Sequence, residues 1–113
     1  MTTNHHPERT ADFTRAYIRR ALQERIRGRG QIDVRRSHQW GVTIFHRYTS
    51  TWSGKAVELP VAQLRGQGGR MQLYWKRASG RWAPYTHPTE PFVGSLNDCL
   101  KEIQHDRWGC FWG

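Results

Sequence analysis

The chain has 113 residues and a formal net charge of +9, with 18 Lys and Arg against 9 Asp and Glu. This length suits one domain and excludes two, and no apolar run in the sequence reaches the length of a membrane span. Leu, Ile, Val and Phe make up less than a fifth of the residues, but six Trp and four Tyr favour an aromatic-rich core over disorder. With two cysteines and no apolar leader, a reducing cytoplasm and free thiols are expected.

A flexible polar leader is expected over residues 1–10 and a single domain over residues 11–113. Apolar spacing predicts a helix from Asp12 to Arg27, with Thr10 or Asp12 as its N-cap. The predicted apolar side of this helix consists of Phe13, Tyr17, Ile18, Ala21 and Leu22. Arg15, Arg19 and Arg27 lie on the opposite side, and like charges four residues apart weaken a helix slightly. This stripe indicates either an anionic ligand or a solvated helix face.

Two short strands are expected next, around Ile32–Val34 and Trp40–Ile44, joined by a long turn over Arg35–Gln39. A third strand is expected over Leu59–Arg65, with Pro60 at a sheet edge or just outside the sheet. Two further strands are expected at Met71–Arg77 and Arg81–Tyr85. Residues 86–94 are too rich in proline for regular structure.

The last predicted element is a helix capped by Ser95 and Asp98, in the arrangement of a capping box. Its apolar stripe consists of Leu96, Cys99, Leu100 and Ile103. Phe111 and Trp112 are expected to pack beneath this helix, and Asp106 to cap it or to accept backbone N–H groups. The order of elements predicts an α+β fold of two layers, with an N-terminal helix, about five antiparallel strands and a C-terminal helix.

The predicted hairpin leaves two registers open. A two-residue loop pairs Trp75 with Pro84, and a three-residue loop pairs Trp75 with Ala83. In either register Leu73 and Trp75 share one face, so Trp75 is expected to be buried. Trp75 and Trp82 are both interpreted as core residues rather than as a stacking surface for nucleic acid. The basic residues Lys76, Arg77 and Arg81 then form a rim that is left for a ligand.

Four motifs of specific spacing follow one another in the second half: VAxLR at 61–65, LYW at 73–75, WxxY at 82–85 and DxxGxFWG at 106–113. With them the second half of the chain resembles the bacterial domain-of-unknown-function family 3024. The resemblance supports the α+β fold, and it implies no particular chemistry.

Fifteen of the 18 basic residues are Arg, whose planar guanidinium matches phosphate geometry. The leading hypothesis is therefore a non-enzymatic protein that binds RNA or DNA mainly through phosphate. The residues predicted to bind are Arg15, Arg19, Arg27, Arg35, Arg36, Lys76, Arg77 and Arg81. One alternative is a protein-interaction module, an inhibitor or a regulator that docks on an acidic partner.

A second alternative is a metal-independent ribonuclease that uses His46 with Arg47, Arg65 and Tyr74 on one sheet. No spacing of Cys and His is typical of a metal site, so neither a metal nor a cofactor is expected.

Overall fold

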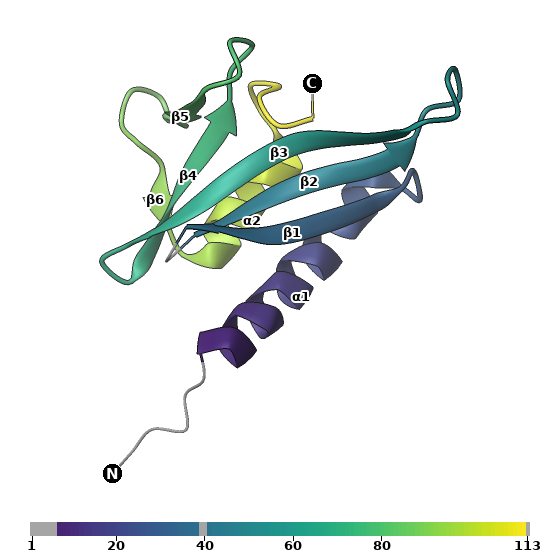
Figure 1. The fold of residues 1–113 in the computed structure, drawn as a ribbon. Coiled ribbons are helices and arrows are strands. Elements are labelled where there is room, and N and C mark those ends of the chain that lie inside the picture. Colours follow the sequence, from purple (N-terminus) through teal and green to yellow (C-terminus); the bar gives the residue numbers. More distant parts are fainter. Residues whose placement is uncertain (1–6, 39–40, 113) are drawn as a thin grey trace.

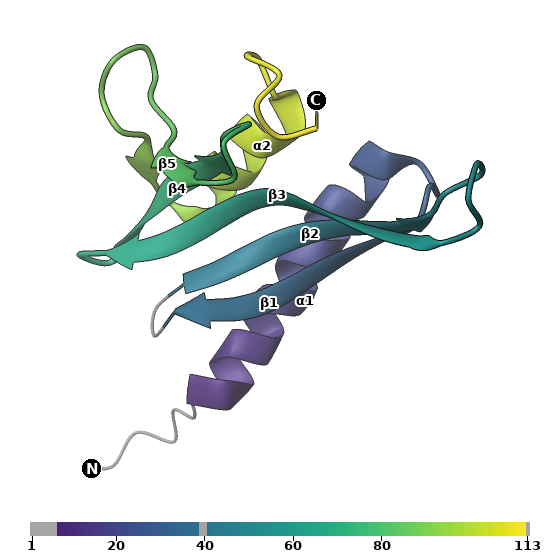
Figure 2. The same ribbon diagram turned by 45° about the horizontal axis from the view of Figure 1, so that its top comes forward.

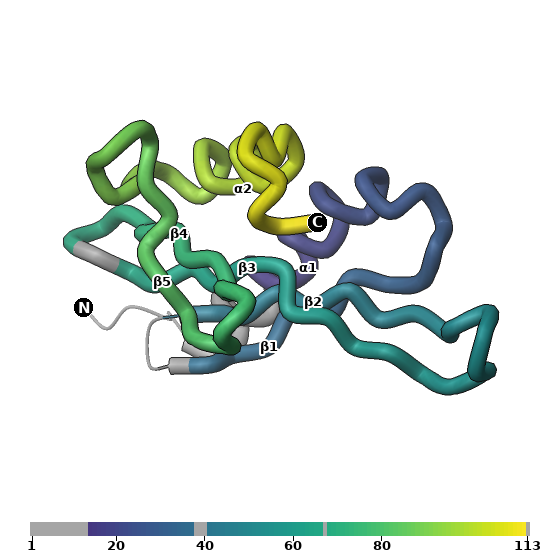
Figure 3. The backbone as a smooth tube through the Cα atoms, turned by 90° about the horizontal axis from the view of Figure 1, so that it is seen from above, coloured from purple at the N-terminus to yellow at the C-terminus, as the bar shows by residue number. Residues whose placement is uncertain are grey.

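The computed structural model describes residues 7–38 and 41–112. The elements in chain order are α1 (Pro7–Ile26), β1 (Gln31–His38), β2 (Gly41–Thr49), β3 (Ala56–Gln67), β4 (Arg70–Lys76), β5 (Trp82–Pro84), β6 (Val93–Gly94) and α2 (Leu96–His105). The strands pair antiparallel in the order β1-β2-β3-β4-β5, and β6 also pairs with β4 (Figure 1). Both helices lie against one face of this sheet (Figure 3). The predicted α+β fold is confirmed, with one short strand more than expected.

The core lies between the helices and the sheet face that they cover. Side chains alternate along a strand, so residues paired directly across the sheet project to the same face. Val42, Leu64 and Leu73 stand opposite one another on β2, β3 and β4, and all three are buried. The helices add buried side chains at helical spacing: Ile18, Leu22 and Ile26 from α1, and Cys99, Leu100 and Ile103 from α2. Two amphipathic helices on a half-apolar sheet thus make one core.

The opposite face of the sheet carries no helix in the part of the chain that the structure describes (Figure 3). It is closed by polar side chains that bond to one another. The amide nitrogen of Gln63 donates to Thr43 Oγ1 over 2.9 Å, and the amide oxygen of Gln63 accepts from Arg65 Nε over 2.7 Å. Thr43 and Gln63 are therefore buried without an unsatisfied polar group. We call this side the open face.

Two expected boundaries were wrong. The first helix begins at Pro7 rather than near Asp12, because proline suits the first helical position, where its missing N–H removes no helical bond. The turn expected at Arg35–Gln39 is mostly strand, since β1 continues to His38 and pairs there with Gly41. Backbone pairing along an edge strand satisfies the N–H and C=O groups whatever the polarity of the side chains. Residues 1–6 of the expected leader, and Trp40, lie outside the described residues.

Pro60 lies inside β3 rather than at its start. The pairing of β2 with β3 shifts between Ile44 and Phe45, where Pro60 stands opposite Phe45. β4 pairs only with the later half of β3, from Gln63 onward. Pro60 therefore occupies a strand segment with one free edge next to a bulge, where a residue without an N–H is tolerated.

The hairpin of β4 and β5 adopts the register of the three-residue loop, with Trp75 opposite Ala83 and Lys76 opposite Trp82. Leu73 is fully buried on the face toward the helices, whereas Trp75 is only half-buried there and packs against the core. Trp82 lies on the open face with Lys76, whose Nζ is 5.6 Å from the ring centroid. The interpretation of Trp82 as a core residue was therefore wrong, because the longer loop turns its side chain to the face away from the helices.

The C-terminal elements match their prediction. Ser95 and Asp98 form the predicted capping box, and Phe111 is buried beneath α2. Asp106 ends the helix in the left-handed conformation, and its carboxylate accepts the N–H groups of Phe111 and Trp112, each over 3.0 Å. No helix in the described ranges is long and apolar enough to cross a bilayer.

Candidate functional site

The sheet extends past the ends of both helices (Figures 1 and 2), and two adjoining cavities lie at these helix ends. The row of helix-facing residues on β2 continues from Ile44 to His46 and Tyr48, with Leu59 of β3 opposite His46. Ile44 is fully buried, whereas His46 and Tyr48 are half-buried and Leu59 is 47% exposed. The same strand face therefore changes from core to surface where the helices end.

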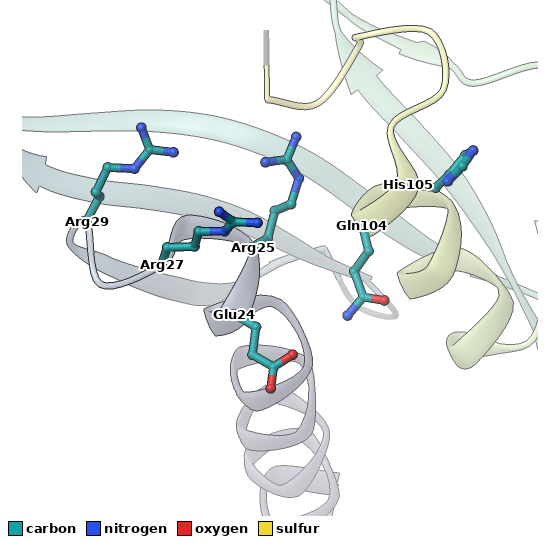
Figure 4. Close-up of a pocket in the computed structure, with 6 residues that line it drawn as sticks. All are labelled: Glu24, Arg25, Arg27, Arg29, Gln104 and His105. Carbon is teal, nitrogen blue, oxygen red and sulfur yellow. The ribbon is translucent and has the colours of Figure 1, made fainter.

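The end of α1 places three arginines around these cavities. Arg27 and Gly28 both have a positive φ, 49° and 77°, and this left-handed turn stops the helix. Arg25, Arg27 and Arg29 point to one side of the helix end, and Gln104 and His105 of α2 lie across from them (Figure 4). These side chains and Glu24 line a cavity of about 670 Å³.

A second cavity of about 510 Å³ adjoins the first and shares Arg25 and Arg29 with it. Its other lining residues are Ile26, His46, Tyr48, Leu59 and Trp112. We call the two cavities together the helix-end cleft, the first its cationic half and the second its aromatic half. Arg25 connects the cationic half to the aromatic half, because its guanidinium carbon lies 5.5 Å from the centroid of the Trp112 ring.

Two side chains of the aromatic half, Trp112 and His46, are positioned by hydrogen bonds to backbone carbonyl groups. The indole N–H of Trp112 donates to the carbonyl of Ile103 over 2.8 Å. His46 Nε2 bonds the carbonyl of Arg29, and since a carbonyl only accepts, Nε2 carries the hydrogen. The His46 ring lies 5.0 Å from Tyr48 and 6.2 Å from Trp112, centroid to centroid. The wall of the cavity is therefore a set of rings in fixed positions.

The arginines of the cationic half are not neutralised by neighbouring carboxylates. Within residues 7–38 and 41–112, none of Arg25, Arg27 and Arg29 forms an ion pair with a carboxylate. The carboxylate of Glu24 is directed away from the three guanidinium groups (Figure 4). Arg29 Nε donates to the carbonyl of Ile26 over 3.2 Å, which satisfies one terminal carbonyl of the helix. The negative end of a helix dipole amounts to about half a charge, too little to neutralise three arginines.

On the open face, in contrast, basic side chains are paired with carboxylates and aromatic rings. Arg35 bonds to Asp33 over 2.8 Å and also to the carboxylate of Glu58, and the bond to Glu58 is the main cause of a raised pKa of Arg35. Three cations also cover three rings on this face: Arg35 on Phe45, Arg65 on Tyr74 and Lys76 on Trp82, at 4.5, 4.0 and 5.6 Å from the centroids. The aromatic rings here already have cationic partners, so this face is not a bare stacking platform.

The eight residues predicted to bind nucleic acid do not form one surface. Arg27 lines the helix-end cleft. Arg19 of α1 lines a separate cavity of about 470 Å³ beside the beginning of β1, which Arg47 of β2 also lines. Arg35 is paired on the open face. The other five lie on the helix body (Arg15), on the edge strand (Arg36) and at the hairpin tip (Lys76, Arg77 and Arg81).

Most of the cleft was not identified from the sequence. His46 was named only as part of a ribonuclease arrangement, and the residues missed were Arg25, Arg29, Tyr48, Leu59 and Trp112. Arg25, Arg27 and Arg29 lie at alternate positions, and in a continuous helix they would project in different directions. Only the left-handed turn at Arg27 brings them to one side. The two glycines that follow Arg27 were the one local signal of that turn.

The arrangement expected for a ribonuclease is not formed. His46 faces the helices, whereas Arg47, Arg65 and Tyr74 all project to the open face. The four side chains therefore cannot surround one scissile phosphate. The described residues also contain no group of three or more His, Cys, Asp and Glu side chains placed to hold a metal ion.

The fold and the cleft define a two-layer α+β protein with a positively charged, aromatic-walled cleft at the ends of its helices. The chain belongs to the family described as Domain of unknown function (DUF3024), whose model matches residues 3–113. The resemblance seen in the second half thus extends over the first half as well. No match was found among curated proteins or among solved structures.

Proposed function

We propose that this protein binds nucleic acid, mainly through phosphate groups held in the helix-end cleft. The observation that carries the proposal is the cluster of Arg25, Arg27 and Arg29, three guanidinium groups on one cavity without a carboxylate partner among the described residues. Arginine binds phosphate through two parallel N–H groups, and such charge-assisted bonds are about twice as strong as neutral ones.

One further basic residue of α1, Arg19, lines the separate cavity beside the beginning of β1. The net charge of +9 adds a long-range attraction that speeds the encounter at low salt. Contacts of this kind carry little sequence information, so binding should depend weakly on sequence.

The test is the salt dependence of binding to a fluorescently labelled single-stranded oligonucleotide, measured by anisotropy. Replacement of Arg25, Arg27 and Arg29 by Gln should weaken binding and reduce the slope of log affinity against log salt by roughly 2, since each lost phosphate contact removes about 0.7. A variant with Lys76, Arg77 and Arg81 replaced by Gln removes the same charge at the hairpin tip and is the matched control.

A larger effect of the hairpin variant would move the binding surface to the rim of the hairpin. Absence of binding by the parent protein even at low salt would contradict the proposal.

An alternative function, docking on an acidic protein, is favoured by Trp52. This side chain is 98% exposed at the tip between β2 and β3, although Ser50 Oγ accepts the N–H groups of Trp52 and Ser53 and so orders the turn. An exposed Trp on an ordered turn is the residue type that dominates protein interfaces. Copurification of partners with and without nuclease treatment separates the two functions, because only a protein partner remains after nuclease treatment.

A further inference from the structure

We infer that the aromatic half of the helix-end cleft receives an unpaired nucleobase, so that the ligand is single-stranded nucleic acid. This inference rests on the proposed function and adds to it the class of nucleic acid. It follows from the juxtaposition of an aromatic cavity with the arginines of the phosphate site.

The cavity has the size and lining of a site for a planar ring. Its volume of about 510 Å³ falls within the range of roughly 300–1,000 Å³ typical of small-molecule pockets. Trp112, Tyr48 and His46 supply rings that can stack on a base. Leu59 is 47% exposed at this cavity, and a ligand with apolar surface that fills the cavity would remove this side chain from water.

Two polar groups on the rings of this cavity are free to bond a ligand. Neither the hydroxyl of Tyr48 nor Nδ1 of His46 has a hydrogen-bond partner within the described residues. Nδ1 is an acceptor in the neutral ring, because Nε2 carries the hydrogen that bonds to Arg29. A few such groups around an apolar cavity orient a ligand, and the edge of a base offers both donors and acceptors to them.

The arginines connect the base to its backbone. Arg25 and Arg29 line both halves of the cleft, so a phosphate held by them lies next to a base in the aromatic half. In a duplex the bases are paired and stacked inside the helix, and their faces are not available. Only a strand with unpaired bases can occupy both halves at once.

The experiment compares three probes that each carry 22 phosphodiesters: a 23-residue oligothymidylate, an abasic oligomer of equal length, and a blunt duplex of 12 base pairs. The parent protein should bind oligothymidylate about ten-fold more tightly than the abasic oligomer, since stacking of one base contributes on the order of ten-fold in affinity. It should also prefer oligothymidylate to the duplex.

The variant Tyr48→Leu should lower the ratio of thymidylate to abasic affinity, because it removes one of the three rings that line the cavity. Tyr74→Leu is its matched control, because Tyr74 is also a half-buried Tyr beside an Arg but lies on the open face. Leu59→Gln is a second cleft variant, at a position too exposed to unfold the protein, and it should lower the ratio as well.

The outcomes separate the two proposals. Equal binding of oligothymidylate and abasic oligomer by the parent protein overturns the base site and leaves the phosphate function standing. Tighter binding of the duplex than of oligothymidylate overturns the base site too. Loss of the ratio in Tyr74→Leu but not in Tyr48→Leu moves stacking to the open face and overturns this inference. Absence of binding to every probe at low salt overturns both proposals.

Discussion

The phenol of Tyr85 donates its hydrogen to Glu102 Oε2 over 2.6 Å, and this bond joins the residue that follows β5 to α2 inside the core. Tyr85 is 1% exposed and Glu102 is 5% exposed. Arg107 also donates to this carboxylate, to Oε2 over 2.8 Å and to Oε1 over 3.1 Å. Burial alone would raise the pKa of Glu102, but the hydrogen bonds from Tyr85 and Arg107 outweigh it and the pKa is lowered. Burial, followed by the bond to Glu102, raises the pKa of Tyr85.

The first prediction is that Tyr85→Phe destabilises the fold by about 1–3 kcal/mol, the cost of removing one partner from a buried charged acceptor. The Phe ring keeps the packing of Tyr85 against Phe111, whose ring centroid is 4.9 Å away. Urea unfolding followed by circular dichroism gives the change. A loss below about 0.5 kcal/mol, the range of neutral surface changes, would mean that water replaces the phenol.

The second prediction concerns acid. Because the pKa of Glu102 is lower in the folded chain than its usual value, its contribution is complete above the unfolded pKa of about 4.3. As the pH falls below that value, the unfolded state takes up the proton first, and this stability is lost through the folded pKa. Unfolding midpoints measured from pH 6 to pH 3 should therefore fall more steeply for the parent than for Glu102→Gln.

Parallel curves for the two proteins would contradict this assignment. Two other carboxyl groups, those of Glu58 and Asp98, also have a lowered pKa. The effect of Glu102 is therefore taken from the difference between the two curves. Glu58 owes its shift mainly to the hydrogen bond from Arg35, and Asp98 to the backbone N–H of Ser95. Both groups are present in the parent and in Glu102→Gln, so their effects cancel in the difference between the two curves.

The third prediction concerns Asp106, which has a φ of 47° and a carboxylate that receives two backbone N–H groups. Asp106→Ala should destabilise the fold by about 1–3 kcal/mol, because it loses both acceptor bonds and leaves Cβ in a conformation unfavourable for Ala. Asp106→Asn should cost clearly less, since Asn tolerates this conformation and keeps one acceptor oxygen. Equal losses for Ala and Asn, measured by thermal unfolding, would assign the effect to charge alone.

The parts of the fold that sequence predicted are those determined by neighbours in the chain. The capping box of Ser95 and Asp98 and the apolar stripe of α2 depend on residues within one or two turns. The register of the hairpin depended on loop length, and both loops suited the same residues. The pairing of the polar end of β1 came from backbone bonds to β2, which leave no pattern in the side chains.

The helix-end cleft was hidden for a similar reason. His46 and Tyr48 continue the alternation of a core strand, and nothing in β2 itself shows that the helices stop short of them. Arg27 was identified as a binding residue from its charge, but its neighbours in space depend on the left-handed turn. Long-range placement of a helix end over a longer sheet decides which strand residues become a site.

The fourth prediction uses that turn to separate stability from binding. Arg27 holds a φ of 49°, a conformation that costs a residue with a Cβ about 1 kcal/mol or more and costs glycine little. Arg27→Gly should therefore leave the thermal midpoint unchanged or raise it by a few degrees. Arg27→Ala keeps the strain and loses the side chain, so its midpoint should not rise, and it serves as the control for the backbone.

Both Arg27 variants should weaken binding to single-stranded oligonucleotide and reduce the salt slope by roughly 0.7, the value of one phosphate contact. A more stable protein that binds less well would show that the arginine is present for its charge and not for the helix end. If Arg27→Gly binds as the parent does, Arg27 makes no phosphate contact and the cationic half depends on Arg25 and Arg29. If Arg27→Gly is less stable than Arg27→Ala, the left-handed turn is held by contacts of the Cβ and the argument from strain is wrong.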